Sequence, residues 1–333
     1  MNYMGFKIAV ATAFAAAIGV SSAAAAPYHG VKASLNYGTL MVKGTKGSDK
    51  IALRLKAGDS SVLQVDAGDD GSAEFSFARA DVARIVVDGG AGSDAIRIDE
   101  SNGVFEDTIP TTLAGGSGND TLSGGSGAEM LLGGSGDDSI DGNRGADTAL
   151  MGSGKDTFIW DPGDGSDKVE GQRGTDTMVF NGANAAEQVD VSANGTRLRF
   201  FRNPGNITMD TAGVERVDFN ALGGADIVAV GDLRATAVRE LNIDLAATLG
   251  GASGDGQADH VTVSGTEGND RIDVSGDAGA VKVSGLAATV RILHSEAALD
   301  RLDINTLGGV DSLVSAGLAA GAIQLFVDGA LAN

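Results

Sequence analysis

Residues 115–179 decide the fold. They read GGSGNDTLS (115–123), GGSGAEMLL (124–132), GGSGDDSID (133–141), GNRGADTAL (142–150) and MGSGKDTFI (151–159), followed after Trp160 and Asp161 by PGDGSDKVE (162–170) and GQRGTDTMV (171–179). This is one nine-residue unit, G-G-x-G-x-D-x-U-x with U apolar, repeated seven times. A fixed short period of this kind is typical of a solenoid, in which each coil stacks on the one before it.

Each unit divides into a turn and a strand. The first six residues form a turn that favours glycine, because such turns need positive φ or a close backbone approach. The last three residues form a short strand whose middle side chain points inward. Two units complete one coil, so units n and n+2 stack on the same edge. We therefore expect these inward residues: Leu122, Leu131, Ile140, Ala149, Phe158, Val169 and Met178.

Stacking places the acids at the sixth position of the unit in two rows. One row contains Asp120, Asp138, Asp156 and Asp176, and the other contains Glu129, Asp147 and Asp167. Neighbouring strands lie about 4.8 Å apart, and two bare carboxylates at that distance repel by about 3–4 kcal/mol at an effective dielectric of 20. Such rows require a cation. Carboxylates and turn carbonyls form an all-oxygen cage, which favours Ca²⁺ over the strictly octahedral Mg²⁺.

The unit resembles the RTX, or haemolysin-type, calcium-binding nonapeptide repeat. The resemblance implies a parallel β-roll with calcium between successive turns, and it assigns metal binding to the matching acids already named. Glu129 departs from the pattern by one methylene. Since turn carbonyls complete the cage, Gly116, Gly118, Gly134 and Gly136 are candidate metal-binding residues as well. The alternative is that these are glycine turns that bind nothing, although turns alone would not require an acid at the sixth position.

Residues 26–114 show alternating strand patterns and two single copies of the turn motif, at 44–49 and 89–94. The second copy matches closely, so Asp94 is a further candidate calcium ligand. Asp49 has no obvious stacked partner, and we expect it to be a turn acid. Residues 101–113 lack periodicity and are expected to loop off the solenoid.

Residues 181–333 continue as strands, with shortened turn motifs ending at Asp226, Asp270 and Asp311. This spacing fits either a β-sandwich or a wider parallel β-helix, and the shared turn motifs favour the helix. Trp160, with Phe158 and Phe180, is expected to mark the point where the narrow roll widens. The sequence shows no clear cap at the C-terminal end, so a partner, self-association or a loop is expected to cover it.

Composition limits the class of protein. The 333 residues contain 51 glycines and no cysteine, and the formal net charge is −21. Disulfides and thiolate metal sites are therefore excluded, and nucleic acid and anionic membrane surfaces are disfavoured as partners, whereas cations are favoured. We predict an all-β fold: a parallel β-roll, or right-handed β-solenoid, with flanking β-rich regions.

The N-terminus indicates export. Residues 1–7 carry one cation, residues 8–20 are apolar and alanine-rich, and Ala23 and Ala25 fit a cleavage site before Ala26. This pattern predicts a secretory signal peptide; the alternative is an uncleaved membrane anchor. No later segment is long and apolar enough to insert into a membrane. We expect a signal peptide at 1–25, an N-terminal region at 26–114, the calcium-binding roll at 115–180 and a C-terminal region at 181–333. The mature protein would be secreted and extracellular, with the periplasm or cell surface as alternatives.

No catalytic motif stands out. The three histidines lack H-E-x-x-H spacing, and no G-x-S-x-G elbow occurs. The favoured function is non-enzymatic: a calcium-binding structural or interaction module. The alternatives are a β-helical polysaccharide-active enzyme, and an adhesin that binds cells or glycans through an outward row such as Thr121, Ser139, Thr157 and Thr177.

Overall fold

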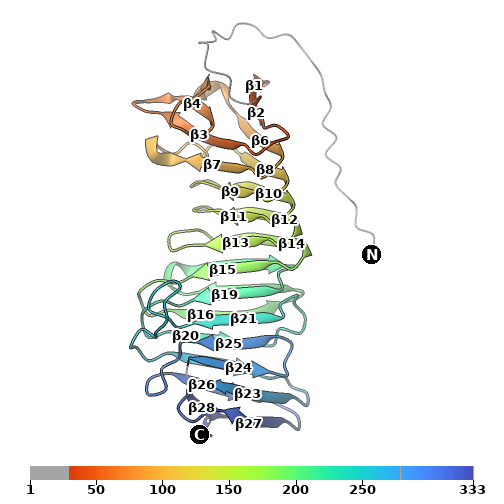
Figure 1. Cartoon of the computed structure of the whole chain (residues 1–333), viewed down its shortest axis with the longest axis vertical. Coiled ribbons are helices and arrows are strands. Elements are labelled where there is room, and N and C mark those ends of the chain that lie inside the picture. Colours follow the sequence, from red (N-terminus) through yellow and green to blue (C-terminus); the bar gives the residue numbers. More distant parts are fainter. Residues whose placement is uncertain (1–29, 278, 333) are drawn as a thin grey trace.

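The computed structural model describes residues 30–277 and 279–332. These residues form one elongated solenoid in which two long, mainly parallel sheets face each other along the whole length (Figure 1). The predicted signal peptide at 1–25 lies outside the described residues. Within the described ranges the chain forms strands and three short 3-10 turns, and it has no helix of the length and hydropathy needed to cross a bilayer.

The first sheet has 15 strands. In spatial order they are β1 (Lys32–Asn36), β2 (Thr39–Lys43), β6 (Arg84–Ala91), β8 (Thr111–Ser117), β10 (Met130–Ser135), β12 (Thr148–Gly154), β14 (Lys168–Gly174), β18 (Ile207–Ala212), β17 (Arg197–Arg202), β16 (Gln188–Asn194), β20 (Ile227–Val230), β22 (His260–Ser264), β26 (Arg301–Asn305), β28 (Gln324–Val327) and β29 (Ala330–Leu331).

The second sheet has 14 strands. From the C-terminal end of the solenoid they are β27 (Ser312–Leu318), β23 (Arg271–Asp277), β24 (Ala280–Ser284), β25 (Thr289–Leu293), β21 (Glu240–Asp244), β19 (Arg216–Asn220), β15 (Thr177–Asn181), β13 (Thr157–Trp160), β11 (Ser139–Asp141), β9 (Thr121–Ser123), β7 (Ala95–Asp99), β3 (Lys50–Lys56), β4 (Asp59–Ala67) and β5 (Phe75–Ala78). The 3-10 turns are η1 (Arg79–Asp81), η2 (Glu100–Asn102) and η3 (Pro204–Asn206).

The register confirms that two units make one coil. In the first sheet β10 pairs in parallel with β8 and β12, which places Leu131 opposite Leu113 and Ala149. In the second sheet Ile140 lies opposite Leu122 and Phe158. All seven predicted inward side chains are fully buried, as the strand alternation requires.

The roll widens at Trp160, as predicted. The strand β11 has three residues and one inward side chain, whereas β15 has five residues and buries both Met178 and Phe180. The Trp160 ring stacks on the Phe180 ring with centroids 4.0 Å apart, and Phe200 and Phe219 continue this aromatic cluster. Beyond this point many strands bury two inward side chains, such as Val189 and Val191 in β16 and Val217 and Phe219 in β19.

The C-terminal region is a continuation of the solenoid. The strands β20, β22 and β26 pair in parallel in the first sheet, as do β19, β21 and β25 in the second. The β-helix alternative is therefore the one observed, and the sandwich is not. At the C-terminal end the β28–β29 hairpin closes the first sheet, and β27 pairs along one edge with β23.

The expectation that residues 101–113 loop off the solenoid is wrong. Phe105 and Ile109 are buried in the common core, and Thr111–Ser117 forms β8. The segment lacks the nine-residue period but carries apolar side chains, which the end of the narrow roll can bury.

The turn glycines stack on one another at close range. Gly116, Gly118, Gly134 and Gly136 have φ between 110° and 123°. A Cβ added to Gly134 would lie 2.1 Å from the Gly116 carbonyl oxygen, and one on Gly136 would lie 2.1 Å from the Gly118 carbonyl oxygen. The stack therefore excludes a side chain on steric grounds as well as on backbone conformation.

We predict that Gly134→Ala destabilises the fold by more than the roughly 1–2 kcal/mol expected for a left-handed residue with a Cβ. The matched control is Gly58→Ala, because Gly58 also has positive φ (74°) but a Cβ there would meet nothing within 4 Å. Chemical denaturation measures both variants. Equal losses of unfolding free energy would show that the close stacking is not a constraint.

Candidate metal centre

The predicted acids form continuous hydrogen-bonded ladders. On the edge where the first sheet passes to the second, Asp120 N–H donates to Asp138 Oδ1 (2.8 Å), Asp138 N–H to Asp156 Oδ1 (2.9 Å), and Asp156 N–H to Asp176 Oδ1 (3.0 Å). Each acid therefore accepts one hydrogen bond from the acid of the preceding coil. We call this row the first-edge ladder.

The first-edge ladder is longer than the repeats. It begins at Asp49, whose N–H donates to Asp94 Oδ1 (2.8 Å), and Asp94 N–H donates to Asp120 Oδ1 (2.8 Å). At the other end Asp176 N–H donates to Glu215 Oε2 (2.9 Å). The expectation that Asp49 has no stacked partner is therefore wrong, because the register of β3 and β7 brings it onto Asp94.

The opposite edge carries the second-edge ladder of Glu129, Asp147 and Asp167. Glu129 N–H donates to Asp147 Oδ1 (2.7 Å), and Asp147 N–H donates to Asp167 Oδ1 (2.9 Å). Glu129 thus occupies the same place in its turn as the aspartates, despite its longer side chain. Glu106, which the sequence pattern did not reveal, lies beside it, and Glu106 Oε1 accepts Ser126 N–H (2.7 Å).

One oxygen of most ladder carboxylates has no hydrogen-bond donor among the described residues. These buried atoms are Asp94 Oδ2, Asp120 Oδ2, Asp138 Oδ2, Asp156 Oδ2 and Asp176 Oδ2 on the first edge, and Glu129 Oε1 and Asp147 Oδ2 on the second. Their residues are at most 3% exposed. An unpaired buried carboxylate oxygen is unfavourable, so the same feature recurring in coil after coil indicates a ligand.

These oxygens lie beside backbone carbonyl oxygens, next to turn glycines that have no side chain to fill the space. We call each such space, with its carboxylate and carbonyl oxygens, a cradle. A Cβ on Gly133 would lie 2.6 Å from Asp138 Oδ2 and 2.3 Å from the Met151 carbonyl oxygen. A Cβ on Gly89 would likewise lie 2.5 Å from Asp94 Oδ2 and 2.6 Å from the Gly115 carbonyl oxygen. Each cradle therefore presents a carboxylate oxygen and a carbonyl oxygen from the next coil, which is the hard-oxygen donor set that calcium prefers.

A family model described as the RTX calcium-binding nonapeptide repeat matches this segment in four copies, over residues 111–138 and 123–158. The chain carries RTX calcium-binding repeats. Calcium is the ion that this repeat binds. No curated protein matches the chain. The single turn copies at 44–49 and 89–94 and the last two units at 162–179 lie outside the matched residues.

The RTX cradles are not carboxylate cages. In the part of the chain that the structure describes, no three Asp, Glu or His side chains are grouped closely enough to hold a metal ion by themselves. A calcium ion in these turns has to use backbone carbonyl oxygens in addition to carboxylates. The carbonyl oxygens of the turn glycines Gly116, Gly118, Gly134 and Gly136 stack against glycines of the following coil, and their metal binding stays a prediction.

A third ladder lies outside the RTX repeats. Glu187 N–H donates to Asp226 Oδ1 (2.8 Å), Asp226 N–H to Asp259 Oδ1 (2.8 Å), and Asp259 N–H to Asp300 Oδ1 (3.0 Å). The sequence pattern revealed only Asp226, as part of a shortened turn. A five-residue pattern could have identified these acids: an acid is followed by apolar residues at the second and fourth positions after it. Examples are Asp226-Ile-Val-Ala-Val and Asp259-His-Val-Thr-Val.

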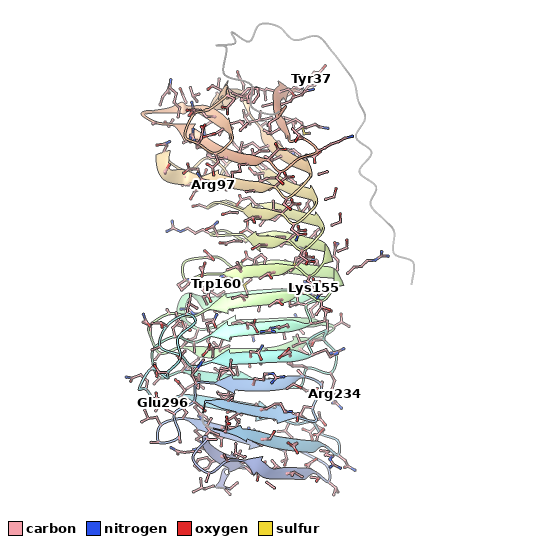
Figure 2. The ribbon with its side chains drawn as sticks, in the orientation of Figure 1. Tyr37, Arg97, Lys155, Trp160, Arg234 and Glu296 are labelled. Atoms are coloured by element: carbon pink, nitrogen blue, oxygen red, sulfur yellow. The ribbon has the colours of Figure 1, made fainter. Side chains whose placement is uncertain are left out.

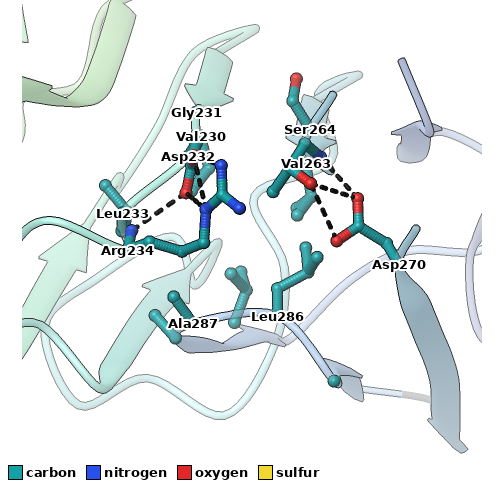
Figure 3. Close-up of a pocket in the computed structure, with 14 residues that line it drawn as sticks. Val230, Gly231, Asp232, Leu233, Arg234, Val263, Ser264, Asp270, Leu286 and Ala287 are labelled. Carbon is teal, nitrogen blue, oxygen red and sulfur yellow. Dashed lines mark hydrogen bonds and ion pairs between the residues drawn. The ribbon is translucent and has the colours of Figure 1, made fainter. Parts of the chain in front are cut away.

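A cavity lies away from the acid ladders. A pocket of about 300 Å³ on the first edge has an apolar floor that includes Val230, Val263 and Leu286 (Figure 3). Its charged side chains have local partners: Arg234 Nη2 donates to Asp232 Oδ2 (2.7 Å), and Asp270 Oδ2 accepts Thr266 N–H (2.6 Å). These local partners make the pocket a weaker candidate for an ion site than the ladders.

Burial makes the ladder acids weak acids. Burial, reinforced by the charges of Asp120 and Asp156, raises the pKa of Asp138 to about 7. Burial, reinforced by Asp167 and Glu129, raises the pKa of Asp147 to about 9. In both cases the hydrogen bond from a backbone N–H opposes the shift without cancelling it. Burial also raises the pKa of Asp94 and of Asp176 to about 6.

We predict that the calcium-free protein loses stability as pH rises from about 4 to about 9. Unfolded carboxyls release their protons near pH 4, whereas the folded ladders release theirs between about pH 6 and pH 9, so the folded state binds more protons throughout this window. Melting curves in chelator should show a Tm on the order of 10 °C lower at pH 9 than at pH 5. Excess calcium should remove or reverse this trend, because the metal replaces the protons. A Tm in chelator that rises with pH would contradict the prediction that the folded ladders hold protons up to about pH 6 to 9.

Proposed function

We propose that the RTX turns of this protein bind Ca²⁺ through Asp94, Asp120, Asp138, Asp156 and Asp176 on the first edge and through Glu129, Asp147 and Asp167 on the second. The observation that carries the proposal is the row of buried carboxylate oxygens that have no donor in the described part of the chain and lie beside carbonyl oxygens of the next coil. Calcium then neutralises the stacked acids, and its binding free energy becomes folding free energy.

The narrow roll has a particular need for this contribution. From Asp120 to Asp156 successive acids of the first-edge ladder are 18 residues apart. The strands of these coils bury one or two inward side chains each, such as Leu122 in β9 and Ala149 and Met151 in β12. Such a core is small for the length of chain that it orders. We infer that residues 115–180 are the metal-dependent part of the chain, between an N-terminal region at 26–114 and a C-terminal region at 181–333.

We predict that Asp138→Asn and Asp137→Asn differ in their response to calcium. Asp138 is buried in the ladder, whereas the adjacent Asp137 is exposed, and its Oδ1 accepts Lys155 N–H. Asparagine keeps an accepting oxygen at both positions but removes the charge. Asp138→Asn should lower the stabilisation by excess calcium by about 2–3 kcal/mol, and Asp137→Asn should leave it unchanged.

The same experiment includes its own control for misfolding. In chelator Asp138→Asn should be at least as stable as the wild type, because it removes a buried charge that nothing neutralises. Circular dichroism and calorimetry, each with chelator and with calcium, measure both effects. A wild-type protein with no heat of calcium binding and one melting curve in both buffers would defeat the proposal.

We also propose that the protein is exported and acts outside the cytoplasm. The alanine-rich apolar run at 8–20, followed by Ala23 and Ala25, supports a cleaved signal peptide. Calcium is plentiful outside the cell and scarce in cytosol, so calcium-coupled folding suits a protein that folds after export. The role that fits best is a structural or interaction module without enzymatic activity.

We predict that the exported protein begins at Ala26. Intact-mass measurement of protein recovered from the periplasm, cell surface or medium of an expressing bacterium should give the mass of residues 26–333. Replacing Ala23 and Ala25 with larger residues should block this cleavage. Recovery of the full 333-residue chain in the cytosol alone would contradict the proposal.

A polysaccharide-active enzyme receives less support. Such an enzyme needs a groove with basic residues and exposed aromatic platforms. The large aromatic side chains Trp160, Phe180, Phe200 and Phe219 are buried in the core, and the cavity of Figure 3 is lined by one arginine and no aromatic residue. An adhesin function receives support from one aligned outward row of small polar residues, Thr121, Ser139, Thr157 and Thr177.

A further inference from the structure

We propose that Glu187, Asp226, Asp259 and Asp300 form a second calcium-binding ladder in the C-terminal half of the solenoid, outside the RTX repeats. Asp255 and Glu296 flank this ladder and add carboxylate oxygens to it. The inference rests on the proposed function of the RTX turns, because it extends the same chemistry to turns of different sequence. We call this row the C-terminal ladder.

The C-terminal ladder reproduces the hydrogen bonding of the RTX ladders. Each backbone N–H donates to one oxygen of the next acid, at 2.8 to 3.0 Å. The four residues are at most 4% exposed. In the described residues no donor reaches the second carboxylate oxygen of Asp226 or of Asp259. Among the described residues the fully buried oxygen of this ladder without a donor is Glu187 Oε2, whereas Asp300 Oδ2 accepts Glu296 N–H (2.5 Å).

A cradle of the RTX type stands at the first step of this ladder. Glu187 Oε2 is buried and has no donor among the described residues. A Cβ on Gly182 would lie 2.5 Å from this oxygen and 2.9 Å from each of the carbonyl oxygens of Asn220 and Ala221. The turn at 182–187 lacks the G-G-x-G sequence, yet it presents the same combination of an unpaired carboxylate oxygen and carbonyls of the next coil.

An arginine side chain neutralises the first acid of this ladder, Glu187. Arg202 is buried, donates from both Nε and Nη2 to Glu187 Oε1, and lies over the Trp160 ring at 5.3 Å. The arginine stands where the inserted strands β17 and β18 separate Asp167 from Glu187. It leaves Glu187 Oε2 unpaired, and among the described residues no arginine forms an ion pair with Asp226, Asp259 or Asp300.

The later steps concentrate negative charge. Asp255 Oδ2 accepts Gly224 N–H (2.8 Å) and Glu296 Oε2 accepts Gly256 N–H (2.6 Å), so both acids are tied to turns of this edge. Figure 2 shows Glu296 on the same lateral edge as Trp160 and away from Arg234. Among the described residues no ion pair involves Asp226, Asp255, Asp259, Glu296 or Asp300. Nearby Arg301 and His260 pair with Asp303 instead.

The acids also act on one another. Burial, reinforced by Asp300, Asp255 and Glu296, raises the pKa of Asp259 to about 7. Burial, reinforced by Asp259, Glu187 and Asp255, raises the pKa of Asp226 to about 8. Five carboxylates with no protein cation, some of them buried and with an oxygen unpaired, are the environment that a hard divalent cation neutralises. Calcium fits better than magnesium because backbone carbonyls in irregular turns do not give strict octahedral geometry.

The test uses the full mature chain and calcium alone. The double variant Asp226→Asn, Asp259→Asn keeps the ladder hydrogen bonds through the amide oxygen but removes two buried charges. After removal of metal with chelator and dialysis against excess calcium, its calcium content should be at least one ion per chain lower than that of the wild type. The matched control is Glu267→Gln, Asp277→Asn, which removes two exposed charges from the same half and should leave the calcium content unchanged.

The outcomes separate this inference from the proposed function. If Asp138→Asn lowers the calcium content and the Asp226, Asp259 variant does not, the second ladder is wrong and the RTX sites stand. If the wild type binds no calcium, the proposed function fails. Should the double variant misfold, anomalous diffraction from wild-type crystals grown in calcium decides: peaks beside Asp226 and Asp259 support the proposal, and their absence at saturating calcium overturns it.

Discussion

The constraint that shapes this structure is repulsion between carboxylates. Coiling stacks the acids of successive turns on one another, at the spacing of neighbouring strands. A backbone N–H from the preceding coil satisfies one oxygen of each acid, as between Asp120 and Asp138. In most of these acids the other oxygen has no donor among the described residues. Because the acids are buried, water screens their repulsion poorly, and protons, a protein cation or a metal ion must neutralise them.

The chain uses a protein cation at some positions and not at others. Near the N-terminal end Arg54 pairs with the buried Asp66 at 2.6 Å, and in the middle of the solenoid Arg202 pairs with Glu187. Each of these arginines lies on a strand of an antiparallel hairpin, β3–β4 or β16–β17. The glycine positions of the nine-residue turns have no room for a side chain, because even a Cβ there would meet the carbonyl of a neighbouring coil. A metal ion needs no side chain of its own, which suits it to the tightest turns.

The sequence predicted the narrow roll well because its period carries the register. In each three-residue strand one side chain points inward, so positions such as Ile140 and Leu122 follow directly from counting. The same counting placed Asp120 on Asp138 and Glu129 on Asp147. The prediction failed where spacing is irregular: Asp49 stacks on Asp94 across 45 residues, and Asp226 stacks on Asp259 across 33. The antiparallel strands β4 and β5 lengthen the first of these spans, and the loops at 231–239 and 245–259 lengthen the second, so neither follows a short period.

The two halves of the solenoid differ in what can stabilise them. In the narrow roll a strand such as β11 buries one side chain, so each coil contributes little apolar area. Beyond Trp160 a strand such as β19 buries both Val217 and Phe219. Stability in a solenoid comes largely from contacts between neighbouring coils. The wide half can therefore provide a preformed surface against which the narrow coils stack.

The ladder hydrogen bonds give this stacking a direction. In every ladder the N–H of one acid donates to the acid of the following coil, so Asp138 is oriented toward Asp120 only when both coils are in place. The last acid of the first-edge ladder in the repeats, Asp176, donates in turn to Glu215 on the wide half. A coil that has not yet stacked lacks both the ordered acid and the carbonyls of its neighbour. Calcium binding in the narrow roll is thus tied to coil-by-coil assembly, and the wide half supplies the first ordered acceptor.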